Sequence, residues 1–194
     1  MATEVVKIVL LGDSGVGKTS IINHFMTGKN SESLKPTVGA AFVTKNIVVD
    51  GHSLELRVWD TAGQEVYRGL APMYYRSAQI AIIVFDVTSN SSYESVDYWV
   101  QELKKNLKGT PVIMVCGNKA DLYEDRSIHD TTAKEFSAAN GALYCETSAM
   151  SGTGINQLFE VALSSMLKEN RQAIATSNGV DLNGDNNSKE GCSC

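Results

Sequence analysis

A glycine-rich segment near the N-terminus has the composition of a phosphate-binding loop. Gly12–Thr19 reads Gly-Asp-Ser-Gly-Val-Gly-Lys-Thr, follows an apolar run at 5–11 and opens a helical pattern at 18–26. Glycines let backbone N–H groups converge on phosphate oxygens, and a helix start adds positive dipole character. Lys18 can reach the terminal phosphates, and the Thr19 hydroxyl can bind Mg²⁺. A glycine-rich turn with a solvated lysine is the alternative, and the full pattern in this context disfavours it.

A second polar segment has the chemistry to distinguish guanine from adenine. Asn118-Lys119-Ala120-Asp121 follows the apolar run at 112–116, at the strand end where parallel sheets bind ligands. An ionised Asp121 only accepts hydrogen bonds, so it can pair with the N1–H and amino groups of guanine. Adenine offers no such donor pair, and leaving the carboxylate buried without a partner costs about 1–3 kcal/mol. Taken alone the segment is equally typical of a surface turn, but behind a phosphate loop it predicts a guanine site.

Short apolar runs alternate with helical patterns, which predicts the frame that positions these segments. Strands are expected at 5–11, 42–49, 54–59, 80–87, 111–116 and 142–146, and helices at 18–26, 92–107, 131–139 and 155–168. Asp50-Gly51 favours a tight type I′ hairpin between two of the strands. The alternation implies right-handed crossovers. We therefore predict an α/β P-loop fold with a six-stranded mixed sheet, mostly parallel with one antiparallel strand, and helices on both faces.

Over residues 5–170 the chain resembles the Ras superfamily of small GTPases. The matching segments are the phosphate loop, Asn118–Asp121, the run Asp60-Thr61-Ala62-Gly63-Gln64, and Ser148-Ala149. The resemblance implies a GTP-binding domain over residues 1–170. It implies phosphate binding by Asp13, Ser14, Gly15, Val16, Gly17, Lys18, Thr19, Ser20 and Gly63, and guanine binding by Asn118, Lys119, Asp121, Ser148 and Ala149. Met150 stands where the family usually has lysine, so no polar role is assigned to it.

The same resemblance implies slow hydrolysis of GTP. Gln64, with a donor and an acceptor, would orient the attacking water, and Lys18 and Thr37 complete the predicted catalytic set. Mg²⁺ would be bound by Thr19 and Thr37 directly and by Asp60 through water. The segments around Thr37 and Gln64 would be held by the γ-phosphate and released on hydrolysis. No arginine of the chain stands out as a transition-state finger, so an activating protein is expected to supply one.

Three aromatic residues and their surroundings are similar to the Rab branch, and most similar to its early-endosomal members. The similar segments are Gly39-Ala40-Ala41-Phe42, Trp59 and Leu70–Arg76, although Val66 replaces a residue that is often basic. Phe42, Trp59 and Tyr74 would form a surface for effectors. Burial of all three in the core is the alternative.

The C-terminal segment predicts a lipid anchor. From about Arg171 hydrophobicity falls and Asn, Gly and Ser accumulate, so residues 171–194 are expected to be a disordered tail. Its end, Gly191-Cys192-Ser193-Cys194, resembles the doubly geranylgeranylated Rab terminus. Two lipids suit a tail without a polybasic patch, because one chain binds a membrane only marginally. Incidental thiols at Cys192 and Cys194 are the alternative.

This resemblance implies a monomer that cycles between cytosol and the cytoplasmic face of endomembranes, with early endosomes as the expected compartment. The implied partners are GTP and GDP, an exchange factor, a GTPase-activating protein, a GDP-dissociation inhibitor, the prenylation escort machinery and effectors. A net charge of −5 offers no footprint for nucleic acid. We expect no secretory signal, no N-myristoylation, and no span of about 20 apolar residues. Cys116 and Cys145 lie in apolar runs and are expected to be reduced.

Two alternative functions stay open at this stage. A nucleotide-gated scaffold without catalysis would make Gln64 dispensable for turnover. A P-loop kinase would need an arginine-bearing lid and would not need the segments at 60–64 and 118–121.

Looser nucleotide binding is predicted from the missing aromatic residue in the segment before Thr37. Relatives usually carry an aromatic residue seven positions before this threonine, where the chain has Asn30, and 29–37 contains no aromatic residue. Stacking on a base contributes roughly 1–3 kcal/mol, so GDP should dissociate faster than from relatives with the aromatic. Stopped-flow release of fluorescent GDP measures this, and release as slow as in those relatives would contradict it.

Overall fold

The computed structural model describes residues 3–29, 40–61, 71–107, 109 and 111–177. The strands are β1 (Glu4–Leu11), β2 (Ala40–Val49), β3 (His52–Thr61), β4 (Ile80–Asp86), β5 (Val112–Asn118) and β6 (Leu143–Glu146). The helices are α1 (Lys18–Thr27), α2 (Ala71–Tyr75), α3 (Asn90–Asn106), α4 (Asp130–Ala139) and α5 (Ile155–Ser177).

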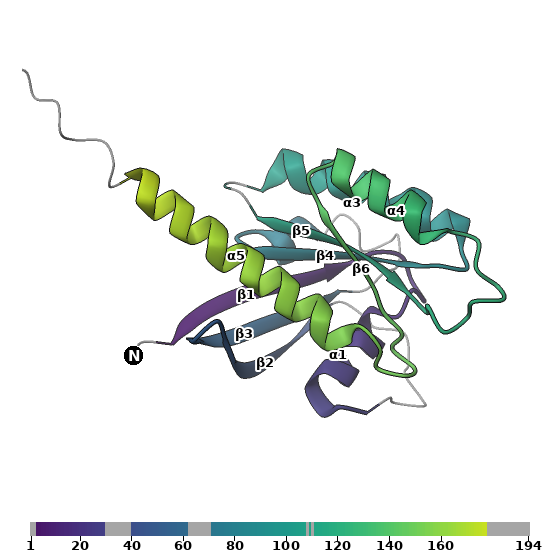
Figure 1. Ribbon diagram of the computed structural model, residues 1–194, viewed down its shortest axis with the longest axis horizontal. Helices are drawn as coiled ribbons and strands as arrows, with labels where there is room; N and C mark the ends of the chain where they lie inside the picture. Colours follow the sequence, from purple (N-terminus) through teal and green to yellow (C-terminus); the bar gives the residue numbers. More distant parts are fainter. Residues whose placement is uncertain (1–2, 30–39, 62–70, 108, 110, 178–194) are drawn as a thin grey trace, which may run out of the picture.

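The strands form one six-stranded sheet in the order β2-β3-β1-β4-β5-β6. Only β2 and β3 pair antiparallel, and all other neighbouring strands are parallel (Figure 1). The predicted mixed α/β sheet is thus confirmed. Because β1, β3, β4, β5 and β6 run in one direction, the loops that follow them meet at one edge of the sheet.

The β2–β3 connection has the predicted hairpin geometry. Asp50 and Gly51 have φ values of 50° and 78°, and the strands resume their pairing at Val49 and His52. Positive φ at both central residues defines the type I′ turn, whose twist matches that of the two strands.

Each face of the sheet is covered by its own set of helices. In β1, Val6, Ile8 and Leu10 face the apolar layer that includes α1 and α5, while Val9 and Leu11 face the layer that includes α2, α3 and α4. This alternation follows from the two-residue period of a strand. Figure 1 shows α5 crossing one face and α3 and α4 lying on the other. Both faces are apolar because both are buried, so the polar chemistry is confined to the edges.

Two helices depart from the predictions. The short α2 was not predicted, and its Tyr75 is buried and donates a hydrogen bond to the Glu102 carboxylate, 2.7 Å away. α5 continues to Ser177, so the prediction of a disordered tail from Arg171 was wrong for residues 171–177. These residues include good helix formers, and extending an existing helix adds a hydrogen bond without a new nucleation cost. Cys192 and Cys194 lie outside the described residues.

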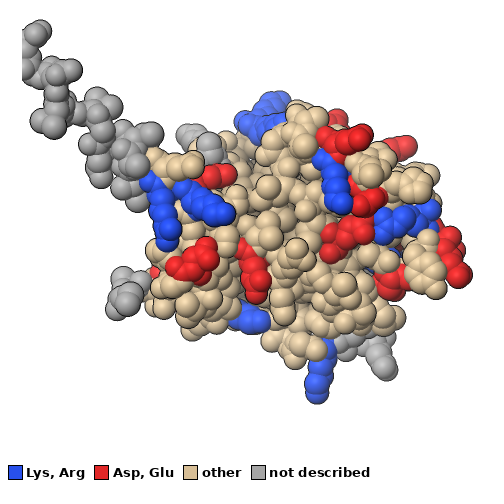
Figure 2. Space-filling model, viewed as in Figure 1, with Lys and Arg blue, Asp and Glu red and all other residues tan. Residues whose placement is uncertain are grey.

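The surface carries both signs of charge. Figure 2 shows acidic and basic side chains interspersed over the face covered by α5. Within the ranges that the structure describes, no helix is both long and apolar enough to cross a membrane.

Candidate nucleotide-binding site

The loop after β1 lies so close to neighbouring strands that two of its positions require glycine. Gly12 has φ +132°, and a Cβ there would lie 2.1 Å from the backbone oxygen of Val84 in β4. Gly17 has φ +99°, and a Cβ there would lie 2.3 Å from the side-chain nitrogen of Asn118. Both glycines therefore allow the predicted phosphate loop to pack directly on the ends of β4 and β5.

The ammonium of Lys18 is buried inside this loop. Its Nζ donates to the carbonyl oxygens of Gly12 (2.8 Å) and Asp13 (2.7 Å), and the residue is 5% exposed. Burial lowers the pKa of Lys18 to about 8, against the opposing effect of the carboxylates of Asp60 and Asp13. A buried cation that loses hydration in this way gains strongly from an anionic ligand. The geometry thus favours phosphate beside Lys18.

Two of the three residues predicted to bind Mg²⁺, Thr19 and Asp60, meet at the start of α1. The Thr19 hydroxyl donates to the Asp60 carboxylate over 2.7 Å, across from the end of β3. Hydroxyl and carboxylate oxygens are the donors that Mg²⁺ prefers, with the remaining positions filled by water and substrate phosphates. The donor set therefore fits a magnesium ion shared with a nucleotide.

Asn118 connects three loops through one buried side-chain amide. Its Nδ2 donates to the Val16 carbonyl (2.8 Å), and its Oδ1 accepts from the Thr147 hydroxyl (3.0 Å) and the Ala149 N–H (3.1 Å). The residue is 1% exposed. In the structure this amide holds the phosphate loop and the 147–149 loop in position, and the contact of Asn118 with guanine stays a prediction.

Asp121 and Ser148 are brought together as predicted. The Ser148 hydroxyl donates to Asp121 Oδ1 over 2.6 Å, and the hydroxyl oxygen accepts from the N–H of Ser151 over 3.1 Å. Asp121 itself is exposed. One carboxylate oxygen is therefore oriented by serine while the side chain stays accessible to a ligand with paired donors.

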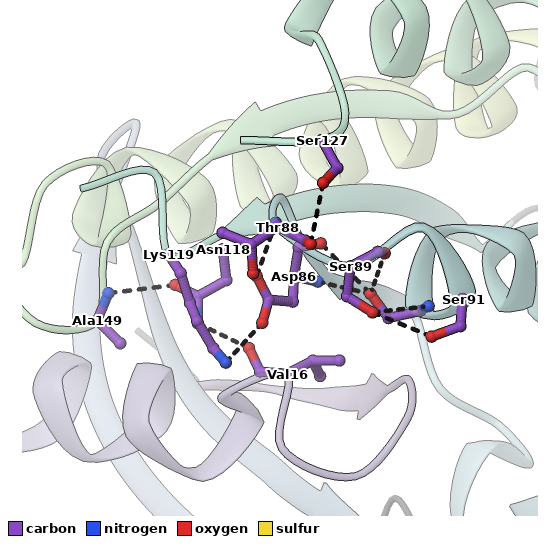
Figure 3. A network of polar contacts seen from close by, with 10 residues as sticks. Val16, Asp86, Thr88, Ser89, Ser91, Asn118, Lys119, Ser127 and Ala149 are labelled. Atoms are coloured by element: carbon purple, nitrogen blue, oxygen red, sulfur yellow. Dashed lines mark hydrogen bonds and ion pairs between the residues drawn. The ribbon is translucent and has the colours of Figure 1, made fainter. Parts of the chain in front are cut away.

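Lys119 forms an ion pair that sequence reasoning did not anticipate. Its Nζ lies 2.6 Å from Asp86 Oδ2, and Figure 3 shows the Lys119 side chain running beside Asn118 toward the phosphate loop. Asp86 is the last residue of β4 and pairs in register with Asn118. Asp86 and Asn118 are polar residues that end two neighbouring apolar strands. This pattern is the sequence signal that could have identified Asp86 as part of the site.

The three predicted effector aromatics form one cluster. The ring centroids of Phe42 and Trp59 are 5.3 Å apart, and those of Trp59 and Tyr74 are 6.1 Å apart. Trp59 and Tyr74 pack partly against the core, whereas Phe42 is 57% exposed. The Lys7 ammonium lies 5.1 Å from the centroid of the Trp59 ring. Burial of all three rings in the core is therefore excluded.

The structure describes only some of the other predicted site residues. Thr37, Gly63 and Gln64 lie outside the described residues. Asp13 accepts a hydrogen bond from the Ser95 hydroxyl of α3 over 2.7 Å. Ser14 and Gly15 are exposed, Ser20 is half-buried, and a Cβ at Gly15 would meet no atom within 4 Å. The outer rim of the phosphate loop is thus open to solvent.

The fold and this loop arrangement define a P-loop nucleotide-binding protein of the small G-protein type. Residues 7–168 match the family model described as Ras family, which covers most of the chain. The chain therefore belongs to the Ras family of small GTPases. As a member it is a GTP-binding switch that hydrolyses GTP with Mg²⁺ and responds to regulators. This excludes both the P-loop kinase and the scaffold without catalysis.

The buried ammonium generates a pH prediction for nucleotide binding. Phosphate needs charged Lys18, and the pKa of this group is about 8 before ligand binds. GDP affinity should be level below pH 8 and then fall, by up to about tenfold per pH unit, because binding must take up a proton. Fluorescence titration from pH 6.5 to 9.5 measures it.

Lys18→Arg is the matched control for this titration. Arginine stays protonated over the whole range, so its affinity profile should be flatter, and any loss from ionisation of GDP itself is common to both proteins. Parallel profiles for the two proteins would contradict the prediction.

Proposed function

We propose that this Ras-family GTPase is a Rab-type switch that recruits effectors in vesicular traffic, at early endosomes. The observation that carries the proposal is the exposed aromatic cluster of Phe42, Trp59 and Tyr74. It lies on β2, β3 and α2, which adjoin the two segments predicted to respond to the γ-phosphate. Clustered aromatic side chains with one open ring are typical of interface hot spots.

In this proposal GTP is hydrolysed by the phosphate loop together with residues from the segments around it. Lys18 neutralises charge on the terminal phosphates, while Thr19, Thr37 and, through water, Asp60 hold the magnesium ion. When bound there, Mg²⁺ would neutralise negative charge on the terminal phosphates. Gln64 orients the attacking water and Gly63 contributes a backbone N–H. Backbone groups of residues 13–20 cradle the phosphates.

Asp121 selects the base. Its carboxylate, which accepts a hydrogen bond from the Ser148 hydroxyl, accepts from guanine, and Lys119 and Ala149 complete the proposed base site. Asn118 contributes by fixing the geometry of the surrounding loops.

Asp121→Asn should shift base preference from guanine to xanthine. The asparagine NH₂ would donate to the xanthine 2-oxo group, whereas it would face the amino group of guanine. Affinity for GDP should fall roughly 10- to 100-fold, the equivalent of about 1–3 kcal/mol, while that for XDP rises. Competition against fluorescent GDP measures both affinities.

Asp125→Asn is the matched control, because it neutralises an exposed carboxylate in the same loop. It should leave both affinities within about twofold. Unchanged selectivity in Asp121→Asn would remove Asp121 from the base site.

Membrane attachment is assigned to Cys192 and Cys194, and partner binding to the aromatic cluster. The double variant Cys192→Ser/Cys194→Ser should therefore be cytosolic. Phe42→Ala should stay on membranes but lose GTP-dependent binding of effectors by more than about tenfold, as truncation of a hot-spot aromatic does. Imaging of the full chain against endosomal markers and affinity capture on GTP- and GDP-loaded protein measure the two effects.

Val48→Ala is the control on the same strand as Phe42. Val48 is 70% exposed on β2 and lies far along the strand from the rings of Trp59 and Tyr74. Endosomal targeting without either cysteine, or undiminished capture by Phe42→Ala, would contradict the proposal.

A further inference from the structure

Lys119 is held in an unusual backbone conformation beside the predicted base site. Its φ is +65°, one of three positive values among the described non-glycine residues. Such a conformation is unfavourable for an L-residue and persists where surrounding contacts stabilise it. The ammonium of its side chain contacts the end of β4.

The main contact is the carboxylate of Asp86. Oδ2 lies 2.6 Å from the Lys119 ammonium, while Oδ1 accepts from the N–H (2.9 Å) and the hydroxyl (2.7 Å) of Thr88. Burial alone would raise the pKa of Asp86, but the bonds from Lys119 and Thr88 together hold that pKa below its usual value. Asp86 is therefore ionised at neutral pH, and Oδ2 is directed at Lys119.

Backbone hydrogen bonds fix the segment that carries Asp86. The Val87 N–H donates to the Asn118 carbonyl over 3.0 Å, which continues the β4–β5 ladder past its last paired residues. The Val87 carbonyl in turn accepts from the N–H groups of Ser127 (2.9 Å) and Ile128 (3.0 Å). Asp86 thus extends from a hydrogen-bonded strand end toward the partly exposed Lys119 (Figure 3).

The ion pair restricts the conformations that the Lys119 side chain can adopt. A free lysine side chain samples many rotamers, and ordering it when a ligand binds costs conformational entropy. With its ammonium anchored on Asp86, the four-carbon stem is ordered in advance and offers an apolar edge between Asn118 and the base-reading Asp121. Such an edge matters in a chain with no aromatic residue at 29–37 to stack on the base.

We propose that Asp86 is a positioning residue for nucleotide retention, which orders the Lys119 stem against the bound guanine. The proposal rests on the proposed function, because it takes the ligand at Asp121 to be a guanine nucleotide. It concerns how long GDP stays bound, and it leaves the hydrolytic chemistry at Lys18 and Gln64 unaffected.

A double-mutant cycle on the full chain tests it, with Asp86→Asn, Lys119→Met and the pair of changes together. Asparagine keeps an oxygen for Thr88 but removes the charge, and methionine keeps an unbranched stem without the ammonium. Each single change should speed the release of fluorescent GDP by about tenfold, and the double variant should be no faster than the faster single variant. For Asp86→Asn, single-turnover hydrolysis of bound GTP should stay within about twofold of wild type.

A merely structural role for Asp86 gives a different pattern. Release rates that multiply in the double variant, release within twofold of wild type in Asp86→Asn, or an equal slowing of hydrolysis would each overturn the proposal. If Asp86→Asn does not fold, judged by thermal melting, Asp86→Ser takes its place in the same cycle.

Asp130→Asn is the matched control, since Asp130 and Lys134 form an ion pair of 2.7 Å on the surface of α4, away from the site. It should leave GDP release unchanged. The Asp121→Asn measurement separates the two proposals: a switch to xanthine together with a failed cycle would refute only the role of Asp86, whereas no switch would refute the base site itself.

Discussion

The buried amide of Asn118 is the interaction on which the nucleotide site depends. It holds the phosphate loop through Val16 and the 147–149 loop through Ala149, and it ends the strand that Asp121 follows by three residues. These segments are far apart in the sequence, and each is an irregular loop with backbone groups to satisfy. One side chain with two donors and an acceptor satisfies several of them at once, so phosphate recognition and base recognition share a single rigid support.

Lys18 and Asp86 are two buried charged residues near Asn118, and they differ in their partners. The ammonium of Lys18 rests on two carbonyl oxygens and has a lowered pKa, so its full stabilisation awaits an anion. The carboxylate of Asp86 already has its cation in Lys119. This contrast separates a binding group from a positioning group: the first leaves electrostatic energy unrealised until ligand arrives, and the second is satisfied in advance.

The assignment to the Ras family and the proposed assignment to its Rab branch rest on different parts of the molecule. The Ras-family match spans the nucleotide-binding fold, in which the carboxyl ends of the parallel strands lie at one sheet edge. The Rab-type proposal rests instead on the aromatic cluster of β2, β3 and α2, and on two terminal cysteines. A switch needs both parts, because nucleotide-dependent loops are informative only when a partner surface adjoins them.

The sequence by itself determined the sheet, the hairpin at Asp50-Gly51 and the phosphate loop, because these depend on local periodicity and on residues within a few positions of each other. It also predicted that Asp121 and Ser148 would meet. Only the tertiary structure decided that Asn118 braces loops, that Asp86 holds Lys119, and that Phe42 is exposed while Trp59 and Tyr74 are partly packed. The end of α5 was misjudged for a related reason: the low hydrophobicity after Arg171 does not stop a helix that packing has already nucleated. Partners that belong to different strands become visible only when the strand order and register place them side by side.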